Sequence, residues 1–243
     1  GTYAENNIKT YGHGMFGSVY DYPYLSSSAN HIFDTTIGFA TTSPLSASTT
    51  SQVAKKVNIY NEMAQYLVGY DDTGSIKKFT MPTTNAQMHS CYFVPFSRLL
   101  VKDEIKKGSF TMELAISGNW SSGGTLFNQR LKLTDASGSN GYYVDSPAGE
   151  YGVLYASTSV GTTSMVDGEN SATGVQPAAG LLYYQAGIAV LSGSVFNTTS
   201  SGGLLKNLDG DPDMGIELGQ GLGLTGFSAV TASTIDIMNT GLR

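Results

Sequence analysis

Large apolar side chains occupy every second position in residues 109–117, SFTMELAIS: Phe110, Met112, Leu114 and Ile116. Successive side chains of a β-strand point to opposite faces of the sheet. The alternation therefore predicts a strand with one face in a core and the other face more polar. Such half-solvated strands are typical of antiparallel sheets.

Four further segments, which flank or follow this strand, have the composition of strands: 126–135, 141–146, 149–157 and 179–194. The tract ASGSNG at 136–141 is rich in turn-forming residues and predicts a hairpin between the first two of them. Ala186–Gly187 predicts a turn or bulge within the last segment. Short strands with Gly- and Ser-rich connections favour an antiparallel β-sandwich or a jelly-roll-like domain, so the fold class is mainly β.

Residues 51–68 give the one convincing helical pattern. Apolar residues recur at intervals of three and four, which predicts an amphipathic helix with these positions buried: Val53, Val57, Tyr60, Met63, Ala64 and Leu67. Ser51 is the predicted N-cap and Gly69 the predicted C-terminal stop. The opposite face is predicted to be solvated and includes Lys55 and Lys56.

Residues 1–50 show neither period and mix aromatic residues with Gly, Pro, Ser and Thr. This composition predicts an extended arm whose rings bury themselves on a neighbouring subunit or on the chain's own domain. The candidate contact residues in this arm are Tyr20, Tyr22, Tyr24, Phe33 and Phe39. The predicted organisation is thus an arm at 1–50 and a β-rich domain at 51–243, with a Gly-rich C-terminal segment at 200–243.

The charge content favours a subunit of an assembly. Charged residues make up 13% of the chain, about half the usual share in a globular protein. The net charge is −6 and the basic residues are scattered, which argues against nucleic-acid binding. No apolar run reaches the ~20 residues that a membrane-spanning helix needs. We therefore expect neither a nucleic-acid partner nor a membrane partner.

Acidic residues gather in NLDGDPDMGIEL at 207–218, where Asp209, Asp211 and Asp213 alternate as in a calcium loop. With Asp209 as the first ligand, the turn glycine falls on Met214 and the closing glutamate on Gln220. The sequence therefore predicts a turn, with a weak cation contact at a subunit boundary as the alternative.

The remaining motifs do not predict catalysis. GLGLTG at 221–226 fits a dinucleotide-binding pattern but is not followed by a helical sequence. His89 and Cys91 are separated by one residue, and the sequence pattern gives no third group that would orient them as a catalytic pair. The acidic residues offer only unspecific carboxylate pairs: Glu104 with Glu113, and Asp145 with Glu150. We expect a protein that is not an enzyme and has no cofactor.

Four segments, taken together, resemble a virion structural protein of tailed phages, particularly the contractile-tailed phages of marine cyanobacteria: 52–76, 90–117, 142–157 and 180–196. The similarity runs from about YGHGMFGSVYDYP at 11–23 to about residue 196. It implies a particle component in the tail, baseplate, neck or head surface, and further β-rich sequence after residue 243.

The expected function is therefore a non-enzymatic structural subunit of a phage virion, assembled in the host cytoplasm and associated with the tail, baseplate or neck. Its expected partners are other virion structural proteins and further copies of itself. The alternative is a β-sandwich module that binds a glycan or receptor on the particle surface, with Trp120 in GNWSSGG as the stacking residue.

Overall fold

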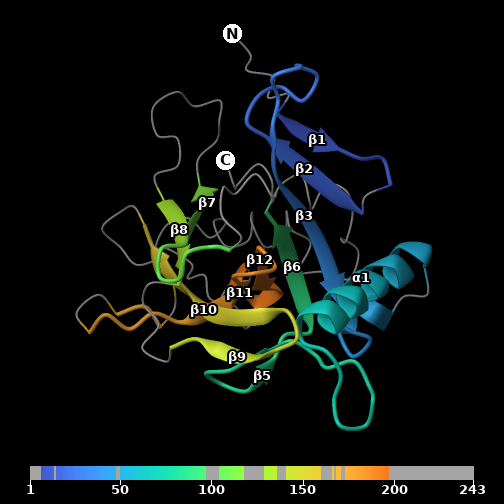
Figure 1. Cartoon of the computed structure of the whole chain (residues 1–243), viewed down its shortest axis with the longest axis vertical. Coiled ribbons are helices and arrows are strands. Elements are labelled where there is room, and N and C mark those ends of the chain that lie inside the picture. Colours follow the sequence, from blue (N-terminus) through green and yellow to red (C-terminus); the bar gives the residue numbers. More distant parts are fainter. Residues whose placement is uncertain are drawn as a thin grey trace.

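The computed structural model describes residues 7–13, 15–47, 50–96, 104–117, 129–135, 141–159, 166, 168–170 and 173–196 (Figure 1). This part of the chain is mainly β and contains one α-helix, as the sequence predicts. Two short 3₁₀ turns, η1 (Pro44–Ala47) and η2 (Gly193–Phe196), complete the described elements.

One antiparallel sheet of ten strands dominates the fold. Its strands are β1 (Ile8–Thr10), β2 (Phe16–Tyr20), β3 (His31–Phe39), β6 (Ser90–Pro95), β7 (Thr111–Ser117), β8 (Gln129–Thr134), β9 (Tyr143–Ser146), β10 (Gly149–Thr158), β11 (Ala178–Tyr183) and β12 (Ile188–Ser192). They follow the order β1-β2-β3-β6-β12-β11-β10-β8-β7, and β9 pairs with β10. A separate small hairpin joins β4 (Thr80–Met81) to β5 (Ala86–Gln87).

The alternating stretch forms β7, with Met112 and Leu114 buried and Glu113 only partly covered, so this prediction is confirmed. The turn predicted at Ala186–Gly187 is also present, because β11 and β12 pair across it and Gly187 has a φ of +66°. A positive φ suits glycine, which has no Cβ to clash with the backbone.

The hairpin predicted across 136–141 is wrong. β8 and β9 do not pair with each other; both pair with β10, β8 through residues 155–158 and β9 through residues 149–151. The strand β10 is ten residues long, which leaves room for two short strands along one edge. Turn-forming composition marks where a connection lies, but it does not say which strands pair.

The N-terminal segment belongs to the sheet, since residues 8–39 contain β1, β2 and β3. The prediction of an arm without regular structure is wrong for these residues. The strand β3 is buried on both faces over its last five residues. A strand buried on both faces shows no alternation of apolar and polar residues, so its sequence lacks the usual strand signal.

Helix α1 (Ser51–Leu67) confirms the predicted helix. Its N-cap is Thr50, one residue before the predicted Ser51, and the Thr50 side chain accepts a hydrogen bond from Val53 N. The helix ends at the predicted place, where Gly69 has a φ of +82°. The prediction that Lys56 is solvated is wrong, because this side chain is fully buried.

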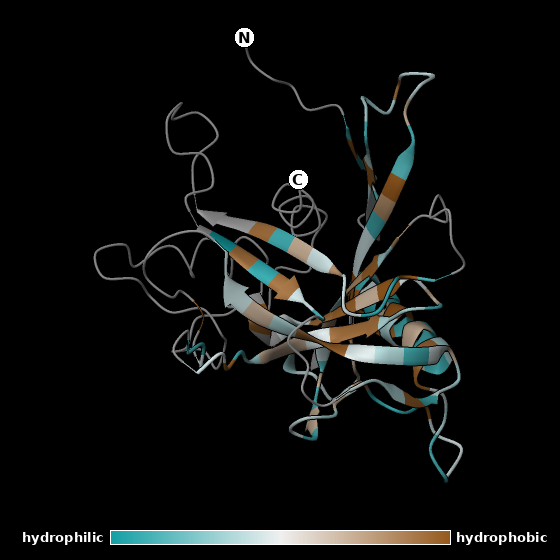
Figure 2. Cartoon of the chain, turned by 60° about the vertical axis from the view of Figure 1, so that its left-hand side comes forward, coloured by the Kyte–Doolittle hydropathy of each residue, from teal (hydrophilic) through white to brown (hydrophobic). Residues whose placement is uncertain are grey.

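Apolar residues are buried on both faces of the sheet. Figure 2 shows apolar positions as brown bands along the strands. One face packs against α1 and the segment around Phe79 and Met88. The other face carries a single cluster of buried apolar residues. Strands from both ends of the sheet contribute to this cluster: β2 and β3 from one end, and β7 and β8 from the other. The helix lies so close to β3 that a Cβ built on Gly38 falls 2.7 Å from Tyr60 N.

Candidate functional site

Two features of the surface are built in a way that suits contact with other molecules. The first is the loop 21–30 between β2 and β3, which lies at the top of the view in Figure 1, away from α1. Asn30 N and Nδ2 donate hydrogen bonds to the two oxygens of the Asp21 carboxylate, at 2.6 and 2.9 Å. Asp21 N in turn donates to the Asn30 carbonyl at 3.1 Å. The loop is therefore closed at its base.

These bonds affect the acidity of Asp21. The hydrogen bonds from Asn30 stabilise the carboxylate and hold the pKa of Asp21 below its ordinary value. Inside the loop, Ser26 N donates to the Pro23 carbonyl at 2.8 Å and Ala29 N to the Ser26 carbonyl at 3.1 Å. A loop with this many internal bonds loses little conformational freedom when a partner binds.

The loop exposes apolar side chains. Tyr22 is 60% exposed and Leu25 is 83% exposed. Tyr20 and Tyr24 are half-buried below them, with ring centroids 6.3 Å apart, and Tyr20 also contacts the His31 ring at 5.4 Å. Tyr22 and Leu25 are thus the exposed large apolar side chains of the loop.

Two of the five predicted contact residues lie elsewhere. Phe33 is 8% exposed and belongs to one of the two core clusters, and Phe39 is fully buried. Their rings are buried within the chain itself, so for these two residues the alternative of packing on the chain's own domain holds. Both belong to β3, whose strand character the sequence does not reveal.

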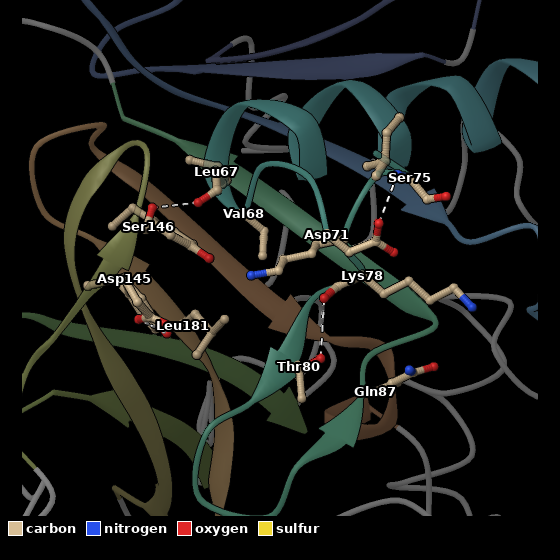
Figure 3. Close-up of a pocket in the computed structure, with 14 residues that line it drawn as sticks. Leu67, Val68, Asp71, Ser75, Lys78, Thr80, Gln87, Asp145, Ser146 and Leu181 are labelled. Carbon is tan, nitrogen blue, oxygen red and sulfur yellow. Dashed lines mark hydrogen bonds between the residues drawn. The ribbon is translucent and has the colours of Figure 1, made fainter. Parts of the chain in front are cut away.

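The second feature is a cavity of about 540 Å³ between the end of α1, the segment 71–80, β5, β9 and the sheet strands β10 and β11 (Figure 3). Its apolar lining comes from Leu67, Val68, Ile76, Leu181 and the tyrosines Tyr151 and Tyr183. Its polar lining comes from Asp71, Ser75, Lys77, Lys78, Thr80, Gln87, Asp145 and Ser146.

A row of tyrosines crosses the sheet beside this cavity. Tyr143, Tyr151 and Tyr183 are directly opposite one another on β9, β10 and β11, and their rings stack at 5.3 and 5.1 Å. The Tyr151 hydroxyl donates to Asp145 Oδ1 at 2.9 Å. Burial, together with this bond and the charge of Asp145, raises the pKa of Tyr151, so its hydroxyl keeps its proton.

The sequence does not reveal this cavity. Its lining residues range from Leu67 to Tyr183 along the chain and come from the six parts just named. Among them, only Asp145 was considered in the sequence analysis for a chemical role, as half of a carboxylate pair with Glu150. The structure gives these two acids different partners, because Glu150 forms an ion pair with Lys107.

The other predicted chemical groups also have separate partners. Cys91 is fully buried, which raises the pKa of its thiol, and the thiol donates to the Met88 carbonyl. His89 Nδ1 instead lies 3.0 Å from Thr42 Oγ1. Glu113 accepts hydrogen bonds from Arg130 and Ser159. Within the described ranges, no three His, Cys, Asp or Glu residues gather as metal ligands.

Several predicted positions lie outside the described residues: Asp209, Asp211, Asp213, Trp120 and the glycine tract 221–226. Among the helices that the structure describes, none has the length and apolar character needed to cross a membrane. In comparisons with known proteins, no family model, no curated protein and no solved structure matches the chain.

Proposed function

We propose that the chain is a non-enzymatic structural subunit of a phage particle, associated with the tail, baseplate or neck, and that it acts through contacts between subunits. The observation that carries the proposal is the loop 21–30, which is closed by hydrogen bonds and exposes Tyr22 and Leu25. Tyrosine is enriched among the residues that contribute most to protein interfaces. The resemblance of four segments to a tailed-phage virion protein supplies the kind of assembly.

The free edges of the sheet support the same proposal. β1 and β7 are its end strands, and within the described ranges neither pairs with a further strand on its outer side. Unpaired strand edges are templates for pairing with another chain. β1 has three residues and includes Lys9, which blunts it, whereas β7 has seven residues. The free edge of β7 is therefore the better place for a contact between chains.

The surface charge is consistent with a role in assembly. Lys107 pairs with Glu150 and Arg130 with Glu113, and the His31 ring contacts the Asp34 carboxylate. With 13% charged residues overall, the chain has little charge repulsion to oppose close contact between its own copies.

The test is to replace Tyr22 and Leu25 by alanine in the phage that encodes the chain, and to measure the copies of the chain per purified particle. Burying each side chain at an interface contributes about 1.5–3 kcal/mol. We therefore expect incorporation under limiting subunit supply to fall at least about tenfold. Because both side chains are exposed, the melting temperature of the isolated chain should not change.

Tyr66→Ala is the matched control, because Tyr66 on α1 is 57% exposed and lies outside the loop. This variant should enter particles like the wild type. Equal incorporation of all three forms would contradict the role of the loop, and absence of the wild-type chain from particles would contradict the proposed function itself.

A further inference from the structure

The cavity beside the tyrosine row takes no part in the proposed assembly contact, yet it has the size of a small-molecule site. Its volume of about 540 Å³ lies within the range of ligand pockets in proteins. It is bounded by the C-terminal end of α1 on one side and by the β4–β5 hairpin on another (Figure 3). Its walls belong to packed elements, since Leu67, Leu181 and Tyr183 are each buried in the core.

The polar groups of the wall are only partly used within the chain. Tyr151 occupies Oδ1 of Asp145, while no group in the described ranges bonds to Oδ2. Lys77 and Lys78 form no ion pair with any described residue. Gln87 on β5 adds an exposed amide to the same wall. The cavity thus offers both donors and acceptors to an occupant.

The charges of the wall indicate a neutral occupant. Two carboxylates, Asp71 and Asp145, are balanced by two ammonium groups, Lys77 and Lys78. Figure 3 places Asp71 and Lys78 on one side of the cavity, apart from Asp145 and Ser146. The two carboxylates repel an anion and the two ammonium groups repel a cation, so the wall favours neither kind of charged occupant.

Two carbonyls at the C-terminal end of α1 are already used within the chain. The Leu67 carbonyl accepts a hydrogen bond from Ser146 Oγ at 2.5 Å. The Ala64 carbonyl accepts bonds from the Val68 and Gly69 backbone amides. These two acceptors are therefore satisfied without an occupant of the cavity.

The apolar part of the wall favours an occupant with carbon surface over a purely polar one such as a small ion. Leu67, Val68, Ile76 and Leu181 provide surface for carbon atoms. The tyrosine rings do not serve as stacking platforms, because they stack on one another and Tyr183 is 1% exposed. The occupant must therefore combine an apolar flank with several hydrogen-bonding groups.

We propose that this cavity binds a short, neutral saccharide. The free oxygen of Asp145 accepts a hydrogen bond from a sugar hydroxyl, and Lys78 and Gln87 donate to hydroxyl or ring oxygens. The aliphatic side chains contact the C–H groups of the sugar ring. This inference does not depend on the assembly contact of the loop 21–30.

The experiment is a titration of the isotope-labelled full chain, followed by amide NMR shifts, with glucose, galactose, N-acetylglucosamine and maltose as probes. At least one sugar should produce saturable shifts confined to residues that line the cavity, with half-saturation at about millimolar concentration or below. Inorganic phosphate and glycine serve as charged and zwitterionic probes and should leave these residues unshifted.

Two variants with matched controls locate the site. Asp145→Asn keeps an oxygen for the Tyr151 hydroxyl but loses the charged acceptor, and it should weaken sugar binding about tenfold. Asp72→Asn is the control for this variant. Asp72 is next to Asp71 in the chain but is exposed and does not line the cavity, so its substitution should not change sugar binding. Lys78→Met should weaken binding, whereas Lys55→Met on the exposed side of α1 should not.

The proposal is overturned if none of the four sugars shifts the cavity residues. It is equally overturned if phosphate or glycine binds there in place of a sugar, or if Asp145→Asn and Asp72→Asn bind the sugar alike. An unchanged melting temperature of each variant shows that the comparison concerns binding and not folding.

Discussion

The buried ammonium group of Lys56 gives the most specific prediction about stability. Its side chain is fully buried between α1 and β3, and its Nζ donates to the Met15 carbonyl at 3.2 Å. The same carbonyl accepts a bond from Thr36 Oγ1 at 2.6 Å. Burial disfavours the charged form and lowers the pKa of Lys56 from 10.5 to about 8.

This pKa sets the direction and size of a pH effect. The unfolded chain takes up the Lys56 proton below pH 10.5, whereas the folded chain takes it up only below about pH 8. The folded state therefore carries a penalty that is fully present below pH 8 and is relieved as the pH rises towards 10.5. At about 1.4 kcal/mol per pKa unit, the penalty at neutral pH is about 3 kcal/mol.

The assay is urea unfolding of the wild type and Lys56→Met, followed by far-ultraviolet circular dichroism between about pH 7 and pH 9.5. Over this range the wild type should gain about 2 kcal/mol relative to the variant. Taking the difference between the two proteins removes the contribution of the tyrosines, which titrate in both. Lys55→Met is the control, since Lys55 is exposed, and its difference from the wild type should not vary with pH.

A difference between wild type and Lys56→Met that stays constant from neutral pH to about pH 9.5 would refute this reasoning. It would mean that the Lys56 ammonium is solvated in the folded chain. A difference that changes in the opposite direction would mean that Lys56 gains more from its hydrogen bonds than it loses through burial.

Three further predictions concern the packing. Gly38→Ala should destabilise the chain by about 2 kcal/mol in urea unfolding, because the new Cβ meets the α1 backbone, whereas Gly12→Ala, with open space around it, should change stability by less than about 0.5 kcal/mol. Tyr60→Phe should cost about 1–3 kcal/mol, because the hydroxyl donates to the Met88 carbonyl and accepts from Phe79 N; an unchanged urea midpoint would contradict this. Cys91, fully buried with its thiol pKa raised, should react with a thiol reagent only after unfolding, and a fast reaction in the native chain would show that the thiol is accessible.

The sequence predicts the strands that bury only one face of the sheet or that are bounded by clear turn residues. β7 alternates because one face is buried, and Gly187 marks the turn between β11 and β12. β3 is not predicted, because its second half is buried on both faces. Its burial depends on α1 and on neighbouring strands that are distant in the sequence.

Lys56 and the cavity illustrate what local sequence patterns do not contain. A lysine in a helical pattern is assigned to the polar face, yet its long aliphatic stem allows it to lie in a core. The groups around Asp145 meet only because β9 pairs with β10 and the end of α1 lies beside them. In the loop 21–30, by contrast, Tyr22 could be named from composition, whereas the exposure of Leu25 required the structure.

We propose that the chain is a built-in component of a phage particle. The most direct test is a cryo-electron-microscopy reconstruction of purified particles of a phage whose genome encodes the chain. We expect density for the ten-stranded sheet and α1 within the tail, baseplate or neck, with Tyr22 and Leu25 in contact with a neighbouring subunit. Purified particles without this chain, together with a free monomer in the host lysate, would contradict it.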